Sequence, residues 1–220
     1  MGQEYNGSEP RKRSPWGLLA LVMLTGLALM RNGTDASLGP PQPASAAALN
    51  SRSEVDGART SHPSSVQPLP YAPASRIRLP DIHVDAPIVD VGLDNEGWID
   101  APSPQDPNLA GWYQNGIAPG QRGTSVIVGH VDNAVGPAVF YNLGSLKKGQ
   151  LIEVARYDGR AAVFEVYGVE VFPKEEFPGP RVYGDMGRPE LRVITCGGGY
   201  SKADGYTGNV VVFAHLVATR

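Results

Sequence analysis

The chain has 220 residues, of which 41% are hydrophobic, 8% aromatic and 19% charged, so it suits one folded domain with additional segments. Its 19 basic and 22 acidic residues nearly balance, which excludes a basic DNA-binding module and gives no reason to expect nucleic acid as a partner. The 27 glycines and 20 prolines leave little room for long helices. The single cysteine excludes an intramolecular disulfide and a multi-cysteine zinc site. We expect the folded part to be rich in strands.

Residues 1–31 have the pattern of a membrane-targeting segment. Three basic residues at 11–13 precede an uncharged run at 16–30. This run of about 15 residues fits the apolar region of a secretory signal and is shorter than most membrane-spanning helices. No small-x-small cleavage site follows the run directly, and the basic flank favours the cytoplasm. We predict an uncleaved signal-anchor; alternatively, the small residues at 44–48 serve a signal peptidase.

Residues 32–75 change in composition to Ala, Ser, Pro, Gly and scattered charge. The frequent prolines interrupt any periodic pattern, and the segment has too few apolar residues to build a core. The sequence therefore predicts a disordered linker that holds the following domain away from the membrane surface.

Residues 76–220 consist of short apolar segments separated by turn residues. Alternation of apolar and polar residues predicts strands at 76–79, 81–85 and 87–91, and the nearly continuous apolar run at 124–130 predicts a strand buried on both faces. The other predicted strands are 151–156, 161–166, 190–196 and 209–214.

The turns and helices of this part follow from a few local signals. An Asp-Gly pair within residues 157–160 marks a hairpin turn between two of the strands. Two short helical pieces are expected at 109–115 and 138–143, both too brief to form a layer. Roughly eight short strands with few helices predict a mainly β domain, either a closed barrel or a sandwich.

Cys196 is the first candidate for chemistry. A free cysteine is most often a small buried hydrophobe, but an exported chain meets oxidising surroundings, where an unpaired thiol is a liability unless it is sequestered or used. Cys196 follows the apolar run 191–195 and precedes three glycines, so we place it at a strand end that faces a cleft. The glycines form a flexible loop, or their N–H groups help to solvate an oxyanion.

A nucleophilic thiol needs a base or a nearby cation, because an ordinary pKa near 8.5 leaves it mostly protonated at neutral pH. His62 lies in the linker, and His83 and His215 lie in alternating strand patterns. His130 follows a buried strand and opens a loop, so it is the candidate partner of Cys196.

The carboxylates give weaker signals. Asp132 has two interpretations: its carboxylate orients His130, or it is a turn-forming residue. We favour the turn. Glu170, Glu175 and Glu176 cluster near a predicted strand end, but three carboxylates in a loop are usually solvated. We therefore assign no metal and no cofactor.

Three segments together resemble the sortase family. They are Val-Gly-His-Val-Asp at 128–132, Val-Ile-Thr-Cys-Gly at 193–197 and Asn-Val-Val-Val-Phe-Ala at 209–214. The resemblance covers most of residues 76–220, and the likeness is strongest to the actinobacterial class E or class F branch. An N-terminal membrane segment with a linker is also usual in that family.

The resemblance implies an eight-stranded sortase-type β-barrel and a cysteine transpeptidase. Such an enzyme cleaves a C-terminal sorting-signal peptide between Thr and Gly through a thioester, and transfers the surface protein to an amine acceptor such as a cell-wall precursor. Carried over by position, Cys196 is the nucleophile and His130 the general acid and base, while Thr195 and Gly197 bind substrate. The implied location is the cell membrane, single-pass, with the catalytic domain outside the cytoplasm.

One position departs from the family pattern. The third catalytic residue is usually an arginine on the last strand, where this sequence has Asn209, and no arginine lies between Cys196 and Arg220. An Asn amide can donate a hydrogen bond but lacks the charge and fork geometry of a guanidinium. Arg192, on the same face of its strand as Cys196, is the other candidate, although a surface cation also explains it.

Two other functions remain open. An exported cysteine hydrolase of cell-wall peptide also needs Cys and His, but the residues before Cys196 lack the Ser-His-Gly-Cys pattern of L,D-transpeptidases, and papain-like enzymes have the cysteine before the histidine. A catalytically decayed surface binding domain would explain the missing arginine.

Overall fold

The computed structural model describes residues 39–49, 66–203 and 205–220. The signal-anchor expected at 1–31 lies outside these ranges. Within them, no helix combines the length and the apolar character needed to cross a bilayer.

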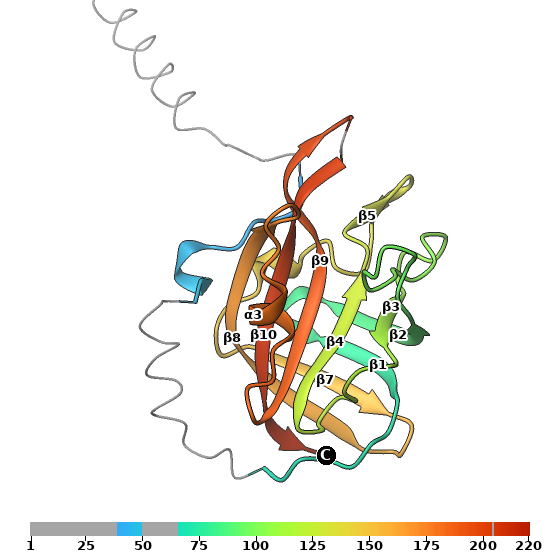
Figure 1. The fold of residues 1–220 in the computed structure, drawn as a ribbon, viewed down its shortest axis with the longest axis vertical. Helices are drawn as coiled ribbons and strands as arrows, with labels where there is room; N and C mark the ends of the chain where they lie inside the picture. Colours follow the sequence, from blue (N-terminus) through green and yellow to red (C-terminus); the bar gives the residue numbers. More distant parts are fainter. Residues whose placement is uncertain (1–38, 50–65, 204) are drawn as a thin grey trace, which may run out of the picture. The chain divides into compact units, whose positions relative to one another are not determined.

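The described residues form a closed barrel of eight strands in the order β1-β2-β3-β4-β9-β10-β8-β7, which confirms the predicted barrel (Figure 1). A separate two-stranded sheet and four short helical turns complete the elements. The barrel strands are β1 (Ala74–Leu79), β2 (Val84–Val91), β3 (Ala110–Tyr113), β4 (Gly123–Gly129), β7 (Leu151–Arg156), β8 (Ala161–Pro173), β9 (Pro189–Ser201) and β10 (Gly205–Thr219). The remaining elements are η1 (Ser45–Ala47), η2 (Pro80–Ile82), β5 (Asp132–Asn133), β6 (Gly136–Pro137), η3 (Leu143–Ser145) and α3 (Gly179–Tyr183).

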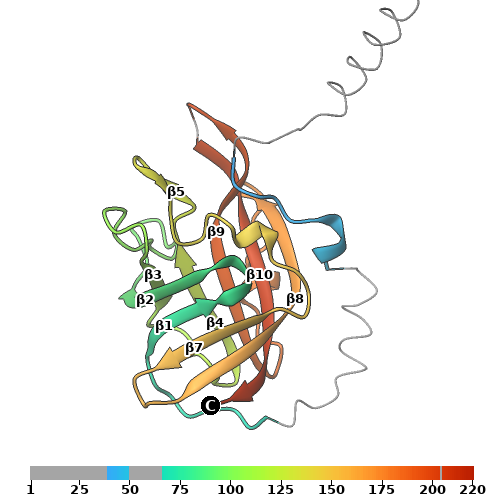
Figure 2. The ribbon, with the colours of Figure 1, turned by 180° about the vertical axis from the view of Figure 1, so that it is seen from behind.

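Two pairings of the described barrel are parallel, β2 with β3 and β4 with β9, and the others are antiparallel. Seen from behind in Figure 2, β1, β2 and β7 form the part of the wall that lies away from α3. The β4–β9 pair matters most for function, because neighbouring parallel strands run toward the same edge of a sheet.

Strands β4, β9 and β10 are buried on both faces. One face contributes to the barrel interior, whose fully buried side chains include Ile77, Trp112, Ile127, Phe164, Val193 and Val212. The outer face carries a second apolar cluster of Val126, Phe172, Val182, Ile194, Val211 and Phe213, to which α3 contributes Val182. This double burial explains the nearly continuous apolar runs of these strands.

Neither predicted helix is present at the expected place. Residues 109–115 contain β3, which pairs with β2 and β4 and whose Trp112 is fully buried. Residues 138–143 form turns, and the short 3-10 turn η3 begins only at the last of them. Strand pairing on both sides of β3 outweighs the weak local preference of a four-residue segment.

Several predicted strand boundaries were also wrong. The strands expected at 161–166 and 209–214 are longer, since β8 continues to Pro173 and β10 spans Gly205–Thr219. The strand expected at 81–85 begins only at Val84, because η2 precedes it and His83 has a left-handed backbone with φ of 58°. The strand of Cys196 does not end at the cysteine, since β9 continues to Ser201 and pairs with β10 across a register shift between Tyr206 and Gly208.

Parts of the linker expected over residues 32–75 contact the barrel. The backbone N–H of Leu49 donates to the Glu170 carboxylate at 2.8 Å, and the N–H of Leu69 donates to the Gly120 carbonyl at 2.8 Å. Strand β1 also begins inside the expected linker. The described parts of this segment therefore belong to the folded unit, which differs from the expected disorder.

Candidate active site

The register of β4 and β9 brings His130 and Cys196 together. Val128 on β4 pairs with Ile194 on β9 in parallel. His130 comes two residues after Val128, and Cys196 comes two residues after Ile194. Because side chains on one face recur every two residues, both side chains stand level on neighbouring strands and face the same side.

Both residues line one cavity of about 520 Å³ on the outer face of the barrel. This volume is in the range of small-ligand and peptide-residue sites. Its walls come from the loop between β2 and β3, the end of β4, β9, β10 and the segment between β8 and β9. The lining residues are Asp94, Trp98, Ile99, Asp100, Ala101, Val128, Gly129, His130, Lys174, Phe177, Tyr183, Ile194, Thr195, Cys196 and Asn209.

Thr195 joins the two strands beside the cavity. Its side chain is buried, and the hydroxyl donates to the carbonyl oxygen of Gly129 at 2.8 Å. Gly129 and Thr195 are the immediate neighbours of His130 and Cys196 in the chain. The bond therefore fixes the separation of the two strands at the level of the candidate pair.

The imidazole of His130 is held by a backbone carbonyl. Its Nε2 lies 2.8 Å from the carbonyl oxygen of Pro102, in the loop between β2 and β3. A carbonyl can only accept, so Nε2 carries the proton, and in the neutral ring Nδ1 has a free lone pair. Asp132 accepts a hydrogen bond from the hydroxyl of Tyr206, so the interaction that orients the ring is with Pro102.

The Cys196 thiol is half-buried and faces charges of both signs. Burial raises its pKa above the ordinary value, the Lys174 charge lowers it, and the Asp132 charge raises it further. The net shift is upward, so at neutral pH the sulfur carries its proton. A nucleophilic step must therefore remove that proton.

Asn209 stands directly opposite Cys196 in the β9–β10 ladder and lines the same cavity. Opposed residues of an antiparallel pair project to the same face, so the amide and the thiol are neighbours. The structure thus brings together His130, Cys196, Thr195 and Asn209.

Gly197 does not line the cavity, unlike Thr195 and Cys196 on the same strand. A Cβ at this position would lie 2.5 Å from Cγ2 of Val210, so the close approach of β10 requires glycine. Gly198 has a φ of 79°, and its N–H donates to the side-chain oxygen of Gln42 at 3.2 Å. The glycines are thus part of a paired strand, which differs from the expected flexible loop.

Arg192 shares the face of Cys196, as expected, but lies outside the cavity. It is 1% exposed, and its guanidinium donates to the Glu190 carboxylate at 2.7 Å and to the Val182 carbonyl at 2.9 Å. It also lies over the ring of Phe213, 4.5 Å from the centroid. These contacts connect α3 to β9. They hold the guanidinium outside the cavity that Cys196 lines.

The remaining candidate residues lie elsewhere. His83 follows η2, and the His215 ring packs at a tilt against Tyr167, with ring centroids 5.7 Å apart. Glu170 binds the Leu49 N–H and the Arg181 guanidinium. In the part of the chain that the structure describes, no three His, Cys, Asp or Glu residues are grouped to hold a metal ion.

Several lining residues were not predicted from the sequence, among them Trp98 and Lys174. Trp98 is half-exposed and meets Phe177 edge-on at 6.2 Å, across the two loops of the cavity. The backbone N–H of Trp98 donates to the Asp94 carboxylate at 2.9 Å, in a turn whose Asp-x-x-Gly sequence was the available signal. Lys174 was not predicted because the strand was expected to end at 166, whereas β8 continues to Pro173 and brings the next residue to the cavity.

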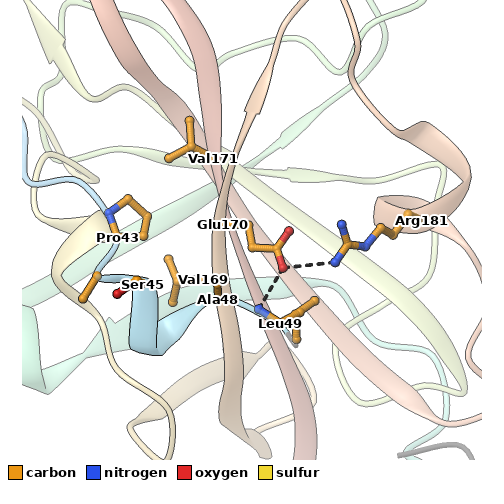
Figure 3. A pocket seen from close by; sticks show the side chains of 9 residues that line it. Pro43, Ser45, Ala48, Leu49, Val169, Glu170, Val171 and Arg181 are labelled. Carbon is orange, nitrogen blue, oxygen red and sulfur yellow. Dashed lines mark hydrogen bonds and ion pairs between the residues drawn. The ribbon is translucent and has the colours of Figure 1, made fainter. Parts of the chain in front are cut away.

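A second cavity, of about 660 Å³, lies between residues 43–49 and β8 (Figure 3). There Glu170 accepts from both Leu49 and Arg181, so its polar groups are largely engaged with each other. Neither Cys196 nor His130 lines this cavity, so the candidate active site is the cavity of about 520 Å³ that both residues line.

Comparisons with known proteins agree with this geometry. The sortase domain model matches residues 77–217, which is more than half of the chain. Among solved structures, sortase C-1 from Actinomyces oris is similar at 22% identity over 91% of this chain and 99% of that chain, with a TM-score of 0.52. A Corynebacterium diphtheriae sortase A lid mutant matches at 22% identity over 90% of this chain and 95% of that chain, with a TM-score of 0.51.

The sortase SrtA from Actinomyces oris matches at 20% identity over 73% of this chain and 89% of that chain, with a TM-score of 0.51. At these identities the structural likeness establishes the shared fold. No curated protein matches the chain. The family match over residues 77–217 shows that the chain belongs to the sortase family of cysteine transpeptidases.

Proposed function

We propose that this sortase cleaves a C-terminal sorting signal between Thr and Gly and transfers the acyl part to an amine acceptor. Cys196 is the nucleophile, and His130 is the general acid and base. The observation that supports these roles most strongly is the register that sets both side chains level at one cavity. A thiol and an imidazole in that arrangement suit nucleophilic acyl transfer.

The reaction follows from the protonation states in the cavity. His130 takes the proton of Cys196 on Nδ1, and the thiolate attacks the Thr carbonyl carbon. The C–N bond to Gly then breaks, His130 returns the proton to the leaving amine, and a thioester remains on Cys196. The incoming amine attacks this thioester and loses a proton to His130, and Cys196 leaves as a thiolate that is reprotonated.

Asn209 is the proposed hydrogen-bond donor to the substrate. Its amide lies opposite Cys196, where it can donate to the carbonyl oxygen that becomes negatively charged. Arg192, the other candidate, is engaged with Glu190 and Val182 and is assigned a structural role. Thr195 is proposed to support recognition of the sorting signal by fixing the strand that carries Cys196.

The walls of the cavity favour an extended peptide with an apolar side chain upstream of the cleaved bond. Trp98, Phe177 and Tyr183 present aromatic surface, and Ile99 and Ile194 add aliphatic surface. A protein backbone segment with one apolar anchor fits this chemistry better than a charged ligand does.

The location and subclass are part of the same proposal. The basic and apolar pattern of residues 1–31 supports a single-pass anchor in the cell membrane, with the catalytic domain outside the cytoplasm. The motifs at 128–132 and 193–197 support assignment to the class E or class F branch. A cell-wall precursor is the expected kind of amine acceptor.

A peptide assay tests the proposal. Full-length protein is incubated with peptides that share a Thr-Gly bond but differ upstream, with and without triglycine, and the products are identified by mass spectrometry. We expect cleavage after Thr and a triglycine adduct, both lost in Cys196→Ala and reduced at least a hundredfold in His130→Ala. Hydrolysis with no adduct would favour a cysteine hydrolase, and intact peptides with a folded protein would favour a binding domain.

A further inference from the structure

The nucleophile of this site is held in its less reactive form. Cys196 is half-buried, and burial is the largest influence on its pKa, which is raised. A thiolate, and not a thiol, attacks a carbonyl carbon. In the proposed reaction His130 removes the thiol proton, and a cation in the cavity would favour the negative charge that is left on the sulfur.

Lys174 lines the cavity from the segment that follows β8. Asn209 pairs with Cys196 on one side and with Phe172 of β8 on the other, so these three residues form a row across the sheet. Lys174 lies just beyond the end of β8, two residues after Phe172, and lines the same cavity as Cys196 and Asn209. Its backbone N–H donates to the Thr207 carbonyl at 3.0 Å, which fixes the chain just beyond β8.

Lys174 is the one Lys or Arg among the described residues that line this cavity. Its side chain is exposed, and in the described structure its ammonium has no ion pair, so no carboxylate neutralises its charge. A lysine stem of four carbons can carry that charge over the half-buried sulfur. The other titratable groups of the cavity wall are Asp94, Asp100, His130 and Tyr183, and the Asp132 charge also acts on the thiol.

We propose that Lys174 is an electrostatic catalytic residue of this site, whose ammonium group stabilises the Cys196 thiolate and the negative charge that develops on the substrate during acyl transfer. The proposal rests on the proposed function. Lys174 keeps its proton throughout, and no bond to it forms or breaks. The opposing acidic charges of Asp94, Asp100 and Asp132 make this one cation more important than it would be in a neutral cavity.

The test measures alkylation of Cys196 in full-length protein, which needs no sorting signal. Rates with neutral iodoacetamide and anionic iodoacetate are measured from pH 6 to 10 in wild type, Lys174→Gln and Lys174→Arg. Lys147→Gln is the matched control, because it removes the same charge from an exposed residue outside the cavity.

We expect the alkylation midpoint of Lys174→Gln to move to higher pH. At pH 7 its iodoacetamide rate should fall about threefold to tenfold, the scale of one charge acting over several ångströms, and its iodoacetate rate should fall further. Lys174→Arg should recover most of both rates, and Lys147→Gln should match wild type. With a cleaved peptide, kcat should fall while KM changes little.

An unchanged midpoint and an unchanged ratio of the two alkylation rates in Lys174→Gln would overturn the proposal, whatever the peptide assay shows. The two proposals fail separately. If the peptides are never cleaved but the Lys174→Gln midpoint shifts, then the charge effect holds and the proposed function does not. If cleavage proceeds and the midpoint stays, only the role of Lys174 is wrong.

Discussion

At the scale of single residues, the site depends on a balance of influences on one sulfur atom. Burial and the Asp132 charge raise the pKa of Cys196, and the Lys174 charge lowers it. The protonated thiol is therefore the resting form at neutral pH, and His130 has to act as a base before it acts as an acid. Its bond to Pro102 prepares it, because Nδ1 is left free in the neutral ring.

The contribution of Asn209 can be measured directly. Asn209→Ala removes an amide that faces Cys196, and we expect kcat/KM to fall by the equivalent of about 2.7 to 4 kcal/mol, the scale for loss of one oxyanion-hole donor. Asn142→Ala, an exposed asparagine outside the cavity, is the control and should match wild type. Near wild-type turnover in a folded Asn209→Ala protein would show that the oxyanion has another donor.

At the scale of elements, the parallel pair β4 and β9 is the frame of the site. Their parallel register sets His130 and Cys196 at the same level. The Thr195 hydroxyl donates to the Gly129 carbonyl at that level. Few other contacts in the described barrel have so direct a bearing on the geometry of the pair.

Thr195→Val tests this frame, because Val has nearly the same volume but cannot donate. The Gly129 carbonyl then lacks its partner, which should cost about 1 kcal/mol of unfolding free energy. We expect kcat to fall by more than tenfold as the two strands separate slightly, and Thr195→Ser to restore it. Equal kcat values for the Val and Ser variants would mean that the hydroxyl does not position the pair.

The buried ion pair of Arg192 and Glu190 has a different role, which is to fasten α3 to the barrel. Arg192→Met leaves Glu190 with one remaining cation, the partly exposed Arg188, and removes the bond to the Val182 carbonyl. We expect a loss of about 3 to 5 kcal/mol in unfolding free energy, measured by denaturant titration. The alkylation rate of Cys196 in the folded fraction should stay within about twofold of wild type, and a large change in that rate with intact stability would restore a catalytic role for Arg192.

At the scale of the whole molecule, periodicity in the sequence predicted a mainly β domain of about eight strands, a barrel or a sandwich, and the resemblance to sortases implied the barrel that the structure has. Seven of its strands have alternating or continuous apolar runs, and the Asp-Gly turn between β7 and β8 is present with Gly159 at a φ of 79°. The β3 segment was not predictable, because its four residues become a strand only by pairing with β2 and β4. Local propensity carries little information for such a short central strand.

The candidate site was predictable only in part, for the same reason. His130 and Cys196 could be chosen from residue chemistry and strand position, but their register across β4 and β9 is a property of the fold. Arg192 was a reasonable candidate by alternation, yet its burial against Glu190 depends on α3. Lys174 and Trp98 lie in loops, where the sequence does not reveal what they face.

One measurement tests the central claim most directly, which is that the barrel brings Cys196 and His130 together for acyl transfer. Full-length protein is mixed with a Thr-Gly peptide, quenched in acid and digested, and the fragment that contains Cys196 is weighed by mass spectrometry. The account predicts an acyl adduct ending in Thr on Cys196, released by hydroxylamine and absent from Cys196→Ala and nearly absent from His130→Ala. Peptide cleavage with an unmodified Cys196, or an adduct that forms equally well without His130, would contradict it.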